Sequence, residues 1–127
     1  RRAYGVDDYF HKSDEEVQCI ALIEDFEAIN NLPELTKVEG IDIFYVAPSD
    51  MAASMGHTGN TGHPDVQAAL ERAIKLVIDG GRIAGTLAND TNIDRFLAMG
   101  VKCVGVPWQL WLKQSAEAFI NRTRTTN

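Results

Sequence analysis

Four short apolar segments, rich in Ile and Val and bounded by turn residues, recur along the chain. Segments of this length and composition are typical of buried strands. We predict strands at residues 17–23, 41–46, 82–87 and 101–106.

A different periodicity separates the second and third segments. Apolar residues recur at three- and four-residue steps from Val66 to Ile78, with Pro64 before them and Gly80 after them. This spacing, with proline at the start and glycine at the end, predicts a helix. Shorter helices are predicted at 27–38 and 92–99, and an amphipathic helix at 110–121.

Strands and helices therefore alternate four times. Consecutive parallel strands joined by right-handed helical crossovers form an α/β sheet with helices packed outside it. Both a barrel and an open sheet satisfy this pattern. A complete (β/α)₈ TIM barrel needs roughly 250 residues. The 127 residues here suffice for half of one, which we expect to form a single domain over residues 1–127.

Two acidic residues follow the first two predicted strands. Glu24 comes after the first strand and Asp50 after the second. In parallel α/β folds, chemistry gathers at the carboxyl ends of the strands, and hard cations such as Mg²⁺ bind carboxylate oxygens there. The alternative is that both acids cap the helices that follow.

Composition limits the classes of partner. The net charge of −6 and the pI near 4.9 argue against nucleic acid or an anionic membrane surface as a partner. Cys19 and Cys103 lack CxxC spacing and fall in predicted buried strands, which indicates reduced structural thiols in a cytoplasmic protein. No apolar stretch reaches the roughly 20 residues that span a bilayer, and the first ten residues contain no hydrophobic signal core.

One segment carries a specific resemblance. Residues 41–66, IDIFYVAPSDMAASMGHTGNTGHPDV, contain Pro48 and Asp50, then a Gly- and Asn-containing loop, then His63-Pro64. This run closely resembles the metal-dependent class II pyruvate aldolases of the HpcH/HpaI aldolase and citrate lyase family. The likeness extends over residues 17–112 and implies the C-terminal half of a phosphoenolpyruvate/pyruvate-type TIM barrel.

The resemblance implies a reaction and a set of site residues. The reaction is reversible aldol cleavage of a 2-oxo-3-deoxy or 4-hydroxy-2-oxo acid to pyruvate and an aldehyde, with a divalent metal stabilising the pyruvate enolate. Glu24 and Asp50 would bind Mg²⁺ or Mn²⁺, and Co²⁺ also suits two carboxylates and water. The backbone amides of Ser49 and Asp50 would hold the pyruvate carboxylate, and Leu87 would line the pocket. Pro48 lacks an amide and leaves these two free, in a turn leading into a helical segment.

The sequence also departs from the family pattern. Leu22 stands where many of these aldolases have a glutamine that contacts the keto acid, Ala47 replaces a glycine, and Pro107-Trp108 replaces Asp-Thr. These changes put the usual substrate in doubt.

The family's general base, a histidine paired with an aspartate, and its substrate-binding arginine belong to the first half of the barrel. None of the three histidines of this chain matches those positions, so the general base is not in this chain. We expect capping or solvent exposure for His11, His57 and His63.

Half a barrel leaves strand edges unpaired, which favours homo-oligomerisation or association with the missing half. The last helix would pack either on a neighbouring subunit, as in the family, or on its own sheet.

Besides an aldolase half, two functions stay open: a non-catalytic metal-binding or assembly module, and a citrate-lyase-like lyase of an acyl thioester. The GHTGNTGHP loop fits the aldolases better than the thioester lyases.

Overall fold

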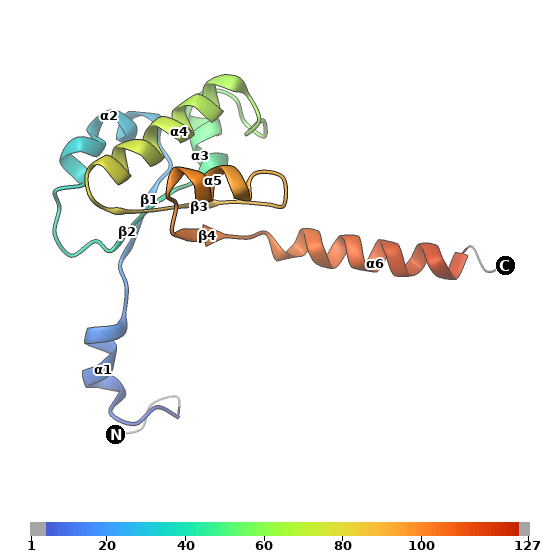
Figure 1. Ribbon diagram of the computed structural model, residues 1–127, viewed down its shortest axis with the longest axis horizontal. Coiled ribbons are helices and arrows are strands. Elements are labelled where there is room, and N and C mark those ends of the chain that lie inside the picture. The colour runs from blue at the N-terminus through green and yellow to red at the C-terminus, as the bar shows by residue number, and fades with distance from the viewer. Residues whose placement is uncertain (1–4, 125–127) are drawn as a thin grey trace.

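The computed structural model describes residues 5–124, so both ends of the expected domain, residues 1–4 and 125–127, lie outside the described part. Four parallel strands form one sheet in the order β1-β2-β3-β4 (Figure 1). They are β1 (Ile20–Ile23), β2 (Ile43–Val46), β3 (Ile83–Leu87) and β4 (Cys103–Gly105). Strand order that follows chain order is typical of a TIM barrel, whereas doubly wound open sheets reverse direction at a switch point. The predicted parallel α/β sheet is confirmed.

The helices that follow the strands cover one face of this sheet (Figure 1). They are α2 (Phe26–Leu35), α3 (Pro48–Ser54), α4 (Pro64–Asp79) and α5 (Ile93–Met99). The helix expected from Pro64 to Gly80 is confirmed as α4, with Gly80 as its C-cap. The helices bury Leu32, Met51, Ile74 and Phe96 against the sheet.

Alternation along each strand separates the two faces of the sheet. Phe44 and Val46 of β2 point to the helices and are 1% and 0% exposed. The parallel register puts Leu22 beside Tyr45 on the opposite face, where Leu22 is 59% exposed. Ile20, Ile83 and Leu87 on that face are exposed as well. In a closed barrel this face would be the packed interior.

Burial of the outer strands differs from the prediction. β2 and β3 are largely buried, but β1 is mostly exposed and β4 is half-buried. Cys19 precedes β1 and is exposed, and Cys103 is only partly buried, so the prediction that both lie in buried strands is wrong. The physical reason is that β1 and β4 are edge strands, each with a neighbour on one side only.

Two terminal helices stand apart from the sheet (Figure 1). The periodicity did not predict α1 (Tyr9–Glu16), which buries no residue. The last helix, α6 (Trp108–Arg124), is longer than the predicted 110–121, extends away from the sheet and also buries no residue. Of the two alternatives for this helix, packing on its own sheet is therefore wrong within the described residues. Its apolar residues Trp108, Trp111, Leu112 and Phe119 lie on one side of the helix at 3.6 residues per turn, as the prediction of an amphipathic helix requires, but they are exposed and this side packs on nothing within residues 5–124. Among residues 5–124, no helix combines the length and apolar content that crossing a bilayer requires.

The contact between helices and sheet should dominate stability. Leu32 is fully buried in α2, whereas Leu97 in α5 is 53% exposed. We expect Leu32→Ala to lower the free energy of unfolding by about 2–5 kcal/mol, because a buried leucine leaves a cavity when truncated. Leu97→Ala, the same chemical change on an exposed surface, should cost less than about 1 kcal/mol. Urea unfolding followed by circular dichroism measures both, and equal losses would contradict the assignment of the core.

Candidate metal and substrate site

Glu24 and Asp50 lie at the same rim of the sheet. Parallel pairing sets Ile23, the last residue of β1, beside Val46, the last residue of β2. Glu24 follows at once, and Asp50 lies in the first turn of α3, which begins two residues after Val46. The Ala47 amide donates to the Ile23 carbonyl at 2.9 Å and holds the two strand ends level.

Neither acid acts as a helix cap. The N-cap of α2 is Asp25, whose carboxylate accepts from the Glu27 amide at 2.7 Å. The N-cap of α3 is Ala47, which has no capping side chain. Glu24 and Asp50 are exposed, and within residues 5–124 neither carboxylate takes part in a hydrogen bond or ion pair. The alternative that these acids cap the following helices is therefore wrong, and both carboxylates are free to bind a cation.

The start of α3 offers donors for an anion. Pro48 occupies the first helical position, and the first backbone bond runs from the Met51 amide to the Ala47 carbonyl at 3.2 Å. The amides of Ser49 and Asp50 precede this bond and have no acceptor inside the helix. The expected turn leading into a helical segment is thus confirmed. Ala47 has an ordinary negative φ of −96°, so the change from the family's glycine strains nothing here.

A small pocket of ≈ 100 Å³ opens at this rim. Ser49 and Leu87, two of the residues expected to contact substrate, both line it. Glu24 and Asp50 are not among its lining residues. The remaining lining residues come from helices α3, α4 and α5 and from the loops around them: Pro48, Thr61, Gln67, Leu70, Ala88, Asn89, Asn92, Phe96 and Pro107.

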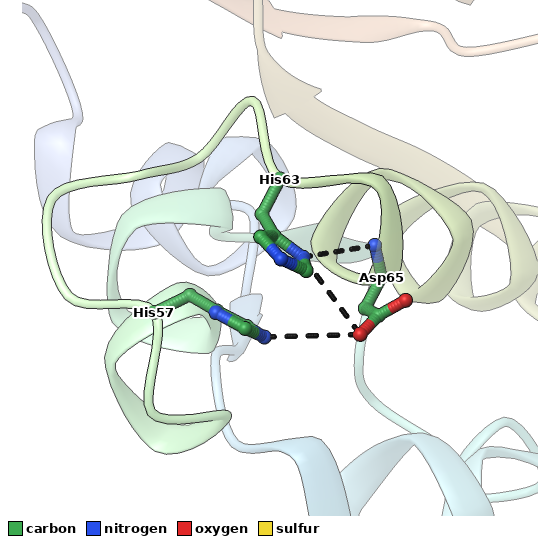
Figure 2. Close-up of side chains that lie close together, drawn as sticks. All are labelled: His57, His63 and Asp65. Atoms are coloured by element: carbon green, nitrogen blue, oxygen red, sulfur yellow. Dashed lines mark hydrogen bonds and ion pairs between the residues drawn. The ribbon is translucent and has the colours of Figure 1, made fainter.

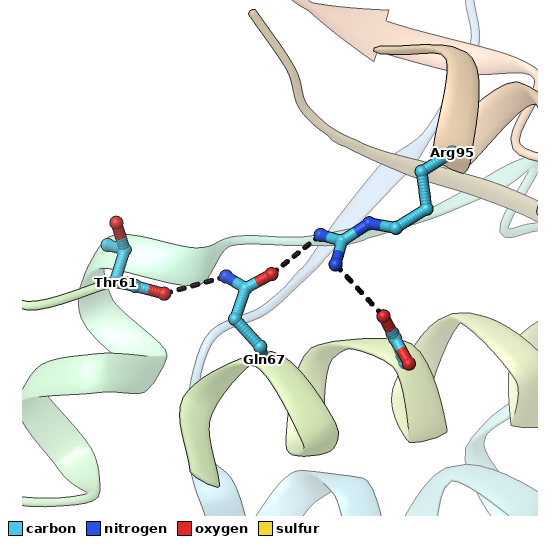
Figure 3. A network of polar contacts seen from close by, with 4 residues as sticks. Thr61, Gln67 and Arg95 are labelled. Atoms are coloured by element: carbon cyan, nitrogen blue, oxygen red, sulfur yellow. Dashed lines mark hydrogen bonds and ion pairs between the residues drawn. The ribbon is translucent and has the colours of Figure 1, made fainter. Parts of the chain in front are cut away.

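A polar network that the sequence analysis did not predict holds one wall of this pocket. The Gln67 side chain donates to the Thr61 carbonyl at 2.7 Å and accepts from Arg95 at 2.6 Å (Figure 3). The Arg95 guanidinium also pairs with Glu71 at 3.0 Å and lies over the Phe96 ring, 4.8 Å from its centroid. The network ties the loop between α3 and α4 to helices α4 and α5.

Tyr45 lies on the face of the sheet that no helix covers. Its ring passes over Gly85 and Gly105, where a Cβ on either glycine would collide with the tyrosine. Burial raises the pKa of the Tyr45 hydroxyl, the nearby Cys103 raises it further, and a hydrogen bond with the Gly105 backbone opposes both. The ring fills part of what would be the barrel interior.

The three histidines have different surroundings. His11 is exposed, as expected, and lies 4.0 Å from Asp8. His63 caps α4, also as expected, because its Nδ1 accepts from the Asp65 amide at 3.2 Å. His57 is neither a cap nor freely exposed, since its ring stacks on His63 with centroids 3.7 Å apart (Figure 2). Both rings lie within ion-pair distance of Asp65, at 3.9 Å for His57 and 3.8 Å for His63.

Sequence reasoning missed this group of His57, His63 and Asp65. The signal was there: two histidines separated by a glycine-rich loop and followed by an acid at the start of a helix.

Comparison with known proteins identifies the family and the fold. The family model described as HpcH/HpaI aldolase/citrate lyase matches residues 3–110. A 4-hydroxy-2-oxo-heptane-1,7-dioate aldolase from Klebsiella pneumoniae is 39% identical over 130 residues, which cover 96% of this chain and 49% of that protein. An Escherichia coli protein of the same name is 39% identical over 120 residues, covering 92% and 45%. The chain thus spans about half the length of these curated relatives.

Solved structures show the same fold. A HpcH/HpaI aldolase/citrate lyase family protein from Burkholderia cenocepacia superposes with a TM-score of 0.80 at 27% identity, over 95% of this chain and 48% of the other. A HpcH/HpaI aldolase from Desulfitobacterium hafniense, at 19% identity, shares the fold with a TM-score of 0.74, over 90% and 46%. The four βα units correspond to half of a TIM-barrel-type fold, and the chain belongs to the HpcH/HpaI aldolase/citrate lyase family.

Proposed function

We propose that this chain is the metal-binding half of a class II aldolase, whose reaction is reversible cleavage of a 4-hydroxy-2-oxo or 2-oxo-3-deoxy acid to pyruvate and an aldehyde. One observation carries the proposal. Two exposed carboxylates without protein partners, Glu24 and Asp50, follow adjacent parallel strands at the rim where Ser49 and Leu87 line a pocket. The names of the curated relatives support the same class of reaction.

The donor set fits a hard divalent cation. Two carboxylate oxygens with water and substrate in the remaining positions suit Mg²⁺ or Mn²⁺, and also Co²⁺. Glu24 and Asp50 would hold the ion, since no other described group competes for their oxygens. When bound, such an ion supplies Lewis acidity that favours the enolate of pyruvate.

The remaining residues of the rim would position the substrate. The free amides of Ser49 and Asp50 would donate to the pyruvate carboxylate, helped by the partial positive charge at the start of α3. Leu87 would contact the apolar part of the substrate. Leu22 offers no hydrogen bond to the keto acid, so this chain orients its substrate with one polar contact fewer than relatives with glutamine there.

The general base would come from outside these residues. Within residues 5–124, no histidine forms a hydrogen bond or ion pair with Glu24 or Asp50: His57 and His63 lie beside Asp65, and His11 lies beside Asp8. The exposed apolar face with Leu22 and Ile83 is the surface on which the other half of the barrel, or another copy of the chain, would pack. We place the complete protein in the cytoplasm, as one domain.

The metal proposal predicts a specific loss of Mn²⁺ binding. Asp50→Asn or Glu24→Gln should weaken Mn²⁺ binding by roughly tenfold or more, because each removes one of only two charged ligands. Oxalate, a mimic of the pyruvate enolate, should strengthen Mn²⁺ binding to the unsubstituted chain. Isothermal titration calorimetry measures both effects.

Glu27→Gln is the matched control, an exposed glutamate three residues from Glu24. It should change Mn²⁺ affinity by no more than about twofold, since a lone exposed charge is well screened. Equal binding by the Asp50→Asn chain and the unsubstituted chain would refute the assignment of the metal ligands.

Catalysis requires the complete barrel. A protein in which the preceding strands are joined to this chain should release pyruvate from a 4-hydroxy-2-oxo acid in the presence of Mn²⁺, and Asp50→Asn should abolish that release. A lactate dehydrogenase assay follows the pyruvate. A folded barrel that binds Mn²⁺ but forms no pyruvate would favour the non-catalytic module, and release of an acyl thioester product instead would favour the citrate-lyase-like reaction.

A further inference from the structure

A second cluster of metal-ligating side chains, which contains neither Glu24 nor Asp50, comes from the loop between α3 and α4 and from the first turn of α4. Two successive turns shape this loop: the Asn60 amide donates to the His57 carbonyl at 2.9 Å, and the His63 amide donates to the Asn60 carbonyl at 3.1 Å. Gly56 and Gly59 have φ of 80° and 77°, which glycine adopts without strain. The loop thereby returns His57 to the side of His63 (Figure 2).

The donor atoms converge. One ligand atom from each of His57, His63 and Asp65 lies within 4.8 Å of the others. The Asp65 Oδ2 atom lies 3.9 Å from His57 Nε2 and 3.8 Å from His63 Nδ1. Neighbouring ligand atoms around a dication, with bonds of about 2.1 Å, lie roughly 3.0–3.5 Å apart. Binding one ion therefore requires the donor atoms to approach one another by about 0.5–1 Å. It also requires the two stacked rings, whose planes are 15° apart, to turn until the nitrogen lone pairs in both ring planes point at the ion.

The Nδ1 atom of His63 is a hydrogen-bond acceptor, as a metal ligand must be. It accepts a hydrogen bond from the Asp65 amide, so this nitrogen carries a lone pair and no proton. Only an unprotonated nitrogen binds a metal. At 3.2 Å the hydrogen bond is at the long end of its range, so a cation would compete with a weak bond.

Burial supports a built site more than a chance meeting of surface side chains. The His57 and His63 side chains are 28% and 33% exposed, and their rings lie side by side, 3.7 Å apart between centroids. Asp65 is 71% exposed and leaves the cluster open to water on one side. Two half-buried imidazoles and a carboxylate open to water are a common donor set for a cation that keeps water ligands.

The donor set selects a different class of ion from the two carboxylates at the rim. Imidazole nitrogens suit Zn²⁺, Ni²⁺ and Cu²⁺, whereas Mg²⁺ requires oxygen ligands. We propose that His57, His63 and Asp65 bind a late first-row divalent metal such as Zn²⁺, independently of the site at Glu24 and Asp50.

The position of the cluster gives this ion a structural role. It would join the loop to the first turn of α4 at His63 and Asp65. Thr61, in the same loop, lines the pocket and accepts from Gln67. An ion bound to His57 would therefore hold the loop that forms one wall of the pocket.

The test measures Zn²⁺ binding by calorimetry in the full chain carrying Glu24→Gln and Asp50→Asn, so that the carboxylate site is removed. This background should still bind one Zn²⁺. Adding His57→Phe, which keeps the stacked ring and removes the nitrogen, should weaken binding roughly tenfold or more, as should His63→Asn, which keeps a helix cap. His11→Phe is the matched control and should leave Zn²⁺ affinity unchanged.

A second measurement does not depend on any variant folding. On addition of Zn²⁺ to the unsubstituted chain, NMR signals of the His57 and His63 rings should shift and that of His11 should not. Failure of the background chain to bind Zn²⁺, equal binding with and without His57→Phe, or shifts at all three histidines would each overturn the proposal.

Discussion

The parallel register of β1, β2 and β3 is the constraint on which the rest of the site depends. Pairing of Ile23 with Val46, and of Val46 with Thr86, makes the three strands end at one level. The residues after each strand therefore meet at one rim, although they lie far apart in the chain. A slip of one residue would turn Phe44 and Val46 away from the helices and remove them from the core. The burial that stabilises the fold and the position of Asp50 are thus fixed by the same hydrogen bonds.

One-sided burial explains how the sheet is stabilised and why its inner face is exposed. The helices cover only the outer face of the sheet, so Leu22 and Leu87 on the inner face are exposed. In a complete barrel these side chains would be interior, and the site would be closed over by the opposite strands. We propose that this half of the barrel binds the cation and the substrate anion, and that the other half transfers the proton. Metal binding and catalysis would then be separable properties.

The sequence predicted those helices and strands whose apolar period matches the side that they bury. It did not predict features that depend on contacts between segments far apart in the chain. The helix after Pro64 and the central strands have a regular apolar period, and both were predicted. Cys19 looked buried because apolar composition cannot tell a central strand from an edge. The helix after Trp108 has an apolar side, as its spacing predicts, but the spacing does not record that the chain leaves β4 in a direction that takes this side away from the sheet. Two glycine-containing turns bring His57 close to His63 and Asp65. The spacing of apolar residues contains no information about the path of such turns.

We propose that Glu24 and Asp50 share one cation. A crystal structure determined with Mn²⁺ and oxalate would show directly whether they do. We predict an anomalous peak with one oxygen from each carboxylate at about 2.0–2.4 Å, and with oxalate on the same ion beside the amide of Ser49. A Mn²⁺ ion bound elsewhere, with neither carboxylate in its coordination shell, would contradict the account.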